Sequence, residues 1–450
     1  ILGGMTMLMG LMMLKLRLGT LQFDELAAKA ESMPKGSLFL PGVLILAGFG
    51  AKAGMFPLHV WLPKAHPVAP APASALLSGI LTKVGIFGIV VITSRLFLGD
   101  EHWGNLLLIL GLINMSLGAL LALFSIDLKR TLACSSMSQI GFILLGIGMQ
   151  SLLGEHNALA AQGTVLHMLN HSLIKLVLFI CAGIVYLRTH SLNLNDIRGF
   201  GRRKWGLMLC FGVGAASISG IPLFSGYASK TLLHESLVEY IVHLQHLGEN
   251  AVWYKAAEWL FILTGGLTFC YMLKLFIVIF IEKHPERQKE YGEVGKSMKP
   301  MTAISLGAAS LLLFVLGVKP GGLLTSLANL SLPFLHAHPP AHAVEYLSGV
   351  NLMGSAKSLL VGALLYLVVV RKALSVPDGH RGRIYTNRWP QWLDLEDLLY
   401  RPAVQGLTKI GFLLSAPLDM LTERVLLPLA MKATGAAAAF LDGAEKAMYA

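Results

Sequence analysis

The stretch Ala158–Leu187, ALAAQGTVLHMLNHSLIKLVLFICAGIVYL, is long and apolar enough to cross a lipid bilayer as a single α-helix. Three titratable side chains, His167, His171 and Lys175, interrupt this run at intervals of four residues. This spacing places them on one face of the helix, spread over about 12 Å. Because ionisable groups are costly inside a membrane, the line predicts a proton relay.

The composition of the whole chain supports a membrane protein. Of its 450 residues, 55% are hydrophobic and only 14% are charged, whereas soluble domains carry about 25% charged residues. These values exclude a water-soluble globule of this length and also exclude intrinsic disorder. The formal net charge is +11. Short cytoplasmic loops rich in Lys and Arg account for this excess, so we expect no nucleic-acid partner.

The apolar segments predict an all-α polytopic membrane fold. The segment at Ile1 does not begin with Met, so we expect it to be the remainder of a longer span in a chain truncated at its N-terminus. The stretch from about Pro402 to Ala450 is predicted to be helical, either spanning or interfacial. The expected spans are Ile1–Leu14, Ser37–Phe56, Ala71–Ser94, Asn105–Ser125, Leu132–Met149, Ala158–Leu187, Gly206–Tyr240, Glu258–Ile281, Met301–Val318 and Met353–Val370.

Loop charges alternate along the chain. Lys and Arg gather in the loops at residues 127–131, 188–204, 283–299 and 371–388, while the loop at 150–157 has none. The positive-inside rule places the basic loops in the cytoplasm. Only the loop at residues 15–36 breaks the pattern. We therefore expect a multi-pass integral protein of a bacterial or archaeal cell membrane.

Two of the expected spans are interrupted. Ser37–Phe56 stops at Pro57, and a polar stretch follows it. Gly206–Tyr240 is broken around Pro222 and Gly226. Backbone breaks at membrane depth are tolerated only inside protein or beside a water-filled cavity. Two broken segments in corresponding places favour an internally repeated transporter.

Charged residues deep in the spans are the candidate functional residues. No carboxylate accompanies most of them at helical spacing, and desolvation disfavours the charged form of an unpaired lysine. Such a lysine can exchange a proton near neutral pH. The predicted proton relay consists of Lys52, Lys83, His167, His171, Lys175 and Lys230, and the possible further members are His66, His234 and Lys274.

The cysteines predict no cofactor. Cys134, Cys181, Cys210 and Cys270 are far apart in apolar stretches, and no CxxC motif exists. Disulfides, zinc and iron–sulfur clusters are therefore not expected. The sequence also lacks a haem motif and a dinucleotide-binding fingerprint. We expect no metal and no cofactor in this chain.

Several motifs together resemble one family. The runs Lys52–His66, Leu76–Gly88, Asp127–Gly141, His167–Lys175 and Phe224–Lys230 are similar to the antiporter-like subunits of respiratory complex I. The same family includes membrane-bound hydrogenases, formate hydrogenlyases and Mrp-type cation/proton antiporters. The resemblance implies inverted five-helix repeats with two broken helices, the first repeat being truncated. The implied divisions are 1–94 (end of the first repeat), 105–281 (second repeat), 301–370 (additional transmembrane helices) and 371–450 (a lateral or interfacial C-terminal extension).

The resemblance also implies a role for each relay residue. Lys52 is similar to the lysine of the first broken helix, whose acidic partner we expect in a helix preceding Ile1. Lys83 resembles a lysine that connects two half-channels, and Lys230 resembles the terminal lysine of the second broken helix. The stretch His167–Lys175 is similar to the central hydrophilic axis.

These observations favour a proton-translocating membrane subunit of a redox-driven complex, resembling NADH–quinone oxidoreductase or an energy-converting hydrogenase. Electrons would then pass through partner membrane and peripheral redox subunits. One alternative is a subunit of a multi-subunit Na⁺/H⁺ antiporter, so the transported ion is H⁺ or Na⁺. The long C-terminal extension fits that alternative poorly. A second alternative is a passive membrane anchor, which would have no use for lysines inside the membrane.

Overall fold

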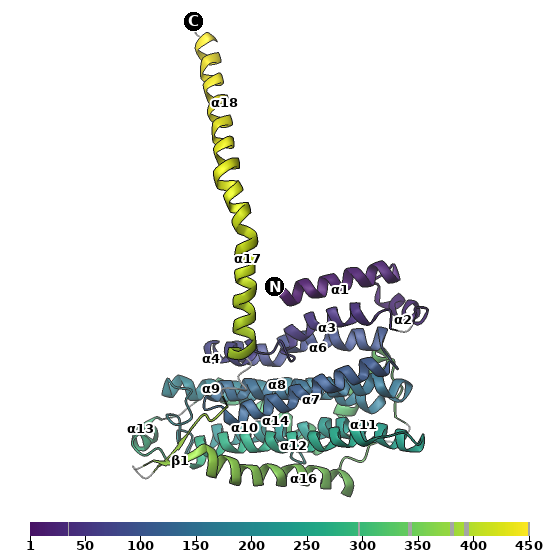
Figure 1. Cartoon of the computed structure of the whole chain (residues 1–450). Coiled ribbons are helices and arrows are strands. Elements are labelled where there is room, and N and C mark those ends of the chain that lie inside the picture. Colours follow the sequence, from purple (N-terminus) through teal and green to yellow (C-terminus); the bar gives the residue numbers. More distant parts are fainter. Residues whose placement is uncertain (35, 296–297, 341–343, 379–381, 391–395, 449–450) are drawn as a thin grey trace. The chain divides into compact units, whose positions relative to one another are not determined.

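The computed structural model describes residues 1–34, 36–295, 298–340, 344–378, 382–390 and 396–448. The chain forms two compact units, Ile1–Arg388 and Trp389–Ala450. In the first unit, long helices run side by side (Figure 1). Within the described ranges, eight helices are long and apolar enough to cross a membrane, and a bent helix pair adds a ninth candidate. The predicted all-α polytopic membrane fold is confirmed.

The secondary structure of the described residues is almost entirely helical. Tight 3₁₀ turns cover Gly154–His156 and Pro333–Leu335, and π-helical turns cover Leu77–Leu81, Ile277–Ile281, Tyr366–Leu374, Glu396–Tyr400 and Thr422–Leu426. The helices and strands are α1 (Leu2–Leu18), α2 (Phe23–Glu31), α3 (Phe39–Ala53), α4 (Trp61–Val68), α5 (Ala71–Leu76), α6 (Thr82–Leu96), α7 (Glu101–Phe124), α8 (Leu128–Leu153), α9 (Ala158–Thr189), α10 (Trp205–Ser219), α11 (Ser225–His246), α12 (Val252–Phe276), α13 (Gln288–Glu293), α14 (Pro300–Val318), α15 (Leu323–Ser331), α16 (Gly349–Leu365), β1 (Ser375–Asp378), β2 (Gly382–Tyr385), α17 (Arg401–Leu421) and α18 (Leu427–Met448).

Every apolar segment that the sequence marks as a span is helical, with ends that differ by a few residues. The short elements α2, α13, α15 and the β1–β2 hairpin were not expected, because none has the length or periodicity of a span. The stretch after Pro402 is helical, as predicted, and its side chains are exposed within their own unit. Of the predicted extension, residues 379–381, 391–395 and 449–450 lie outside the described residues. The inverted repeat and the proposed divisions of the chain remain predictions.

Helix α8 is the central element of the first unit. Its most apolar stretch is completely buried by other helices. Helix α7 approaches it so closely that a Cβ at Gly141 would lie 2.2 Å from the backbone nitrogen of Met115, and one at Gly118 would lie 2.5 Å from that of Ser138. Small residues allow such close packing of membrane helices. As a result, the polar side chains of α8 face protein and not lipid.

Both interrupted spans are broken in the structure. Helix α3 ends at Ala53 and is capped by Gly54, which has a left-handed φ of 77°, and α4 starts at Trp61 beyond Pro57. The indole nitrogen of Trp61 donates to the carbonyl of Ala51 at 2.9 Å, so one of the carbonyls at the end of α3 is satisfied. The backbone nitrogen of Phe56, inside the break, donates to a side-chain oxygen of α7 at 2.8 Å.

The second break lies between α10 and α11. Helix α10 ends at Ser219 and is capped by Gly220, whose φ is 76°, and Pro222 follows inside the break. Gly226 lies beyond the break, as the second residue of α11. A Cβ there would lie 2.0 Å from the carbonyl oxygen of Ser217. Gly226 therefore lets α11 approach α10 closely, whereas Gly220 makes the turn.

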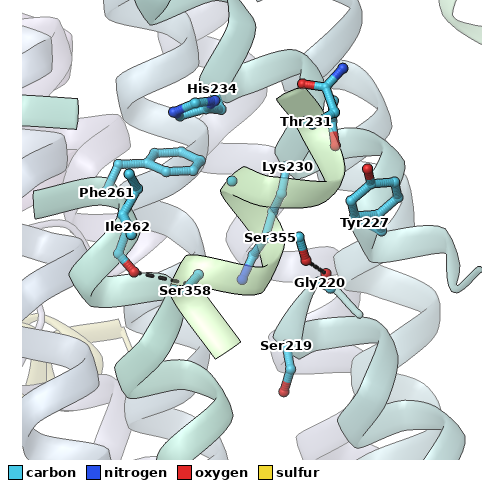
Figure 2. Close-up of a pocket in the computed structure, with 13 residues that line it drawn as sticks. Ser219, Gly220, Tyr227, Lys230, Thr231, His234, Phe261, Ile262, Ser355 and Ser358 are labelled. Carbon is cyan, nitrogen blue, oxygen red and sulfur yellow. Dashed lines mark hydrogen bonds between the residues drawn. The ribbon is translucent and has the colours of Figure 1, made fainter. Parts of the chain in front are cut away.

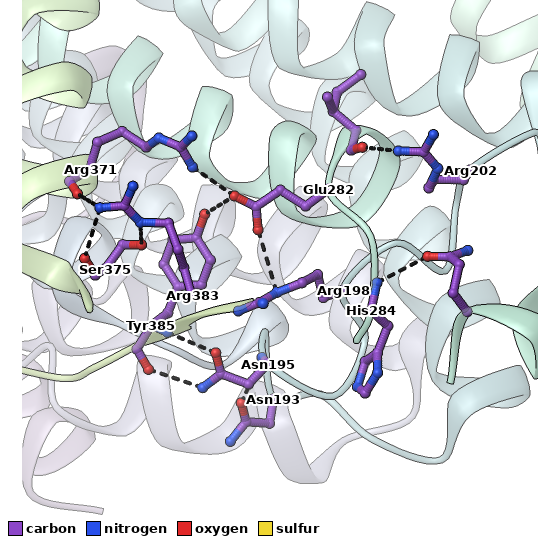
Figure 3. A network of polar contacts seen from close by, with 12 residues as sticks. Asn193, Asn195, Arg198, Arg202, Glu282, His284, Arg371, Ser375, Arg383 and Tyr385 are labelled. Carbon is purple, nitrogen blue, oxygen red and sulfur yellow. Dashed lines mark hydrogen bonds and ion pairs between the residues drawn. The ribbon is translucent and has the colours of Figure 1, made fainter. Parts of the chain in front are cut away.

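One carboxylate joins three of the basic loops (Figure 3). Glu282 follows the π-helical turn Ile277–Ile281 that continues α12. It forms ion pairs with Arg198 at 3.4 Å and Arg371 at 2.9 Å, and it accepts a hydrogen bond from the hydroxyl of Tyr385 at 2.9 Å. Burial, and then the neighbouring Glu282, raise the pKa of Tyr385, so the phenol stays protonated and donates. Asn195 binds the backbone of Tyr385 through both its amide atoms. The hairpin is thus anchored where the loops with the most Lys and Arg meet, at one end of the bundle.

We predict that Gly141→Leu destabilises the protein by about 3 kcal/mol or more, because the added side chain would collide with the backbone of α7. The measurement is thermal unfolding of the purified protein in detergent. Gly307→Leu on α14 is the matched control, since nothing lies within 4 Å of a Cβ at that position. Equal melting temperatures for the two variants would contradict the close contact between α7 and α8.

Candidate proton-conducting site

A lysine and a histidine from different helices are in direct contact at the centre of the first unit. The Lys83 amine on α6 lies 2.5 Å from the Nδ1 of His171 on α9, and it donates to the carbonyl of Ser78 at 2.6 Å. Lys83 is 8% exposed and His171 is 1% exposed. An amine and an imidazole nitrogen at this distance form a donor–acceptor pair that can share one proton. The structure therefore brings together two residues of the predicted relay that are 88 positions apart.

His167 extends this pair along α9. Its ring lies nearly parallel to that of His171, with the ring centroids 6.5 Å apart. The two ring nitrogens of His167 contact the side-chain oxygen of Gln139 at 3.1 Å and the hydroxyl of Ser229 at 3.0 Å. Both of its nitrogens therefore have polar partners, contributed by α8 and α11.

Lys175 lies one turn beyond His171, and its amine turns toward α8. It donates to the carbonyl of Leu132 at 2.8 Å and to the hydroxyl of Ser135 at 2.9 Å. The hydroxyl of Tyr271 on α12 donates to the same Ser135 oxygen at 3.0 Å. Lys175 is completely buried. The Nε2 of His171 is also buried and has no hydrogen-bond partner among the described residues, as expected where a water molecule bridges polar groups.

Lys230 lies directly after the second break. Its amine donates to the carbonyl of Ile218, at the end of α10, at a distance of 2.8 Å. The same amine lies 4.8 Å from the ring centroid of Phe142, and that ring lies 6.1 Å from the ring of His167. Phe142 therefore contacts both Lys230 and His167. Lys230 also lines a cavity of about 60 Å³ (Figure 2).

The other predicted residues occupy different surroundings. His234 is one turn past Lys230, and its Nε2 lies 3.1 Å from a carboxylate oxygen of Glu258. His66 is buried and stacks on Phe179 with ring centroids 4.6 Å apart, and neither of its ring nitrogens has a hydrogen-bond partner among the described residues. Lys52 is exposed on α3. Its expected acidic partner remains a prediction.

Lys274, which the sequence suggests as a further relay residue, is positioned as a helix cap. It is 2% exposed, so it does not extend to the membrane surface. Its amine donates to the carbonyls of Ala122, Leu123 and Ser125, at 3.2, 2.7 and 2.7 Å, where α7 ends. A cation is favourable there because the carbonyl end of a helix carries partial negative charge.

The buried lysines of the predicted site share one kind of partner. Each amine donates to a backbone carbonyl, and no Asp or Glu in the described ranges is buried. These lysines are Lys83, Lys175, Lys230 and Lys274.

The polar residues that complete the site were not singled out from the sequence, although the run of Ser and Gln in the otherwise apolar α8 was a usable signal. The missed residues are Ser135, Gln139, Ser229 and Tyr271.

Fold and site together define a polytopic α-helical membrane protein that has two interrupted helices and a line of titratable groups in its interior. The family model described as "NADH:quinone oxidoreductase/Mrp antiporter, TM" matches residues 1–247. The chain belongs to this family, and the resemblance seen in the sequence is confirmed.

Individual relatives agree with this assignment. Hydrogenase-4 component B of Escherichia coli K12 is 33% identical over 371 residues, which are 79% of this chain and 53% of the relative. Formate hydrogenlyase subunit 3 of the same strain is 37% identical over 226 residues, 49% of this chain and 37% of the relative. The chain thus spans about half or less of these relatives. A structure of the Mrp complex from Dietzia sp. DQ12-45-1b superposes with a TM-score of 0.62 at 23% identity, covering 74% of this chain and 67% of that one, which shows a common fold.

We predict that Lys274→Met lowers stability by about 1–3 kcal/mol, because the carbonyls at the end of α7 lose their donor while they stay buried. Thermal unfolding in detergent measures the change. Lys255→Met is the matched control, since Lys255 is exposed on the same helix. An unchanged melting temperature would show that Lys274 is not a cap.

Proposed function

We propose that this chain conducts protons across the membrane as one subunit of a redox-driven, multi-subunit complex. The observation that carries the proposal is the direct contact between Lys83 and His171. It lies within a line of titratable groups that is buried and lacks buried carboxylates in the described ranges. A positive charge held only by neutral groups can leave as a proton, because no fixed anion retains it.

The central transfer is a simple proton exchange. The Lys83 ammonium gives one proton to Nδ1 of His171 and becomes a neutral amine, while the imidazole becomes an imidazolium. The imidazolium then releases the proton on Nε2, which has no partner in the described protein. One proton has then moved across the ring, and a water molecule at Nε2 would carry it onward toward Lys175 or His167.

The energy for transport must come from outside this line. Moving one charge against 100 mV requires about 2.3 kcal/mol. We propose that oxidation and reduction in partner subunits supply it, since relatives of this chain are named as components of a hydrogenase and of formate hydrogenlyase. Those reactions would alter hydration and the positions of charged groups around the lysines.

The alternatives predict different behaviour. A Na⁺/H⁺ antiporter subunit, favoured by the structural likeness to an Mrp complex, would exchange protons for sodium without an electron donor. A passive anchor would tolerate apolar replacements of all the buried lysines. Assays with and without sodium, and with and without an electron donor, separate these functions.

We predict that Lys175→Ala reduces proton pumping more than tenfold while the complex still assembles, because the central amine between α8 and α9 is lost. Proton uptake into vesicles measures pumping, and native gel electrophoresis measures assembly. Lys289→Ala, at an exposed position on α13, is the control. Normal pumping by an assembled Lys175→Ala complex would refute the relay.

We also predict that Lys230→Glu retains partial pumping, whereas Lys230→Leu retains almost none. A carboxyl group can still exchange protons with water in the adjoining cavity, but a leucine cannot. Both variants are compared at matched expression by redox-driven proton uptake. Equal activity of the two would mean that Lys230 is structural.

A further inference from the structure

The cavity beside Lys230 is large enough to hold water, and polar side chains line part of its wall. It lies between the α10–α11 break, α11, α12 and α16 (Figure 2). A buried water requires about 10–15 Å³, so a volume of about 60 Å³ has room for roughly four. The hydroxyl groups on its wall belong to Ser219, Tyr227, Thr231, Ser355 and Ser358.

A histidine–carboxylate pair lies on the outer side of this cavity. His234 lines the cavity and contacts Glu258 of α12 at 3.1 Å. It is four residues past Lys230, which is a rise of about 6 Å along α11. Exposure increases in the same direction, because Lys230 is buried whereas His234 and Glu258 are half-buried. The pair therefore lies between the buried amine and the surface.

Helix α16 completes the wall, although it lies outside residues 1–247 that match the family model. Ser355 donates to the carbonyl of Gly220 in the break at 2.9 Å, and Ser358 donates to the carbonyl of Ile262 in α12 at 3.0 Å. The helices α12 and α16 pack so closely that a Cβ at Gly362 would lie 2.4 Å from the carbonyl oxygen of Gly266. Gly266 and Gly362 allow this close packing because neither has a side chain.

The chain direction of the surrounding helices shows which face of the bundle lies nearer to the cavity. Helix α11 runs from the break to the loop at residues 247–251, and α12 starts directly after that loop. The basic loops at 188–204 and 283–299 precede α10 and follow α12, at the opposite end of these helices. His234 and Glu258 are therefore nearer to the face that lacks the basic loops.

We propose that His234 and Glu258 are the terminal proton-exchange pair of Lys230, in a water-filled port that α16 closes on one side and that opens opposite the basic loops. The assignment rests on the proposed function. Lys230 releases one proton to the cavity water and becomes a neutral amine. His234 accepts a proton from that water, and the imidazolium passes one to solvent with the Glu258 carboxylate stabilising its charge.

Cysteine labelling tests the port. His234→Cys and Ser355→Cys are made separately, and the complex in sealed vesicles of each orientation is treated with a charged, membrane-impermeant methanethiosulfonate. We expect both cysteines to react from the face opposite the basic loops and at least tenfold more slowly from the other face. Leu233→Cys is the matched control because Leu233 is completely buried. The native cysteines are all buried, so the unmodified complex gives the background.

Reaction of Ser355→Cys from the basic-loop face, or from neither face, would overturn the port.

A second experiment tests the pair. We expect Glu258→Gln and His234→Gln each to slow proton pumping at least fivefold, with Glu249→Gln in the exposed loop as the control. Normal pumping by both variants would refute the role of His234 and Glu258 as the proton-exchange pair. It would do so even if pumping is lost in Lys175→Ala and proton conduction is thereby supported. Normal pumping by Lys175→Ala would refute the relay but leave the labelling result intact.

Discussion

A lysine amine buried in a membrane bundle needs an acceptor, and in this protein backbone carbonyls fill that role. Carbonyls that lack an intrahelical partner occur where a helix ends or departs from regular geometry. Three of the lysines use such carbonyls, whereas Lys175 donates to the carbonyl of Leu132 inside α8. Lys274 lies at the end of α7, Lys230 at the end of α10, and Lys83 at a π-helical turn. The helix breaks therefore supply hydrogen-bond acceptors for some of the buried cations. In this way they help to position the candidate site.

The choice of carbonyls over carboxylates has chemical consequences. A carboxylate beside a buried lysine would hold its proton through a strong charge pair, and removing either partner would leave an uncompensated charge. A carbonyl dipole stabilises the ammonium less, and it can still contact the neutral amine. The amines of Lys83 and Lys175 thus have partners in both protonation states, which suits groups that gain and lose protons. Where a carboxylate pairs with arginines, at Glu282, the contact anchors loops at one end of the bundle.

Hydropathy and periodicity were sufficient to predict the spans, the two interruptions and the shared face of His167, His171 and Lys175. These features depend on local sequence. The contacts that give the residues their roles depend on tertiary structure, such as the pairing of Lys83 with His171 from another helix. Lys274 illustrates the difference, because its place in a span suggested a relay residue but gave no sign that its amine donates to the carbonyls at the end of α7; its part in a relay remains a prediction. The hairpin after α16 also could not be predicted, since its anchors are distant in sequence.

The line of titratable groups is divided by an aromatic ring. Phe142 contacts both His167 and the amine of Lys230, so a proton that passes between them must go around an apolar side chain that cannot carry it. A fully hydrogen-bonded path open to both faces would let protons return down their gradient and dissipate it. An apolar interruption between two polar segments prevents this leak as long as no water bridges them. Under the proposed function, transport would therefore depend on when the space around Phe142 is hydrated, and the proposed redox partners would act by changing that hydration.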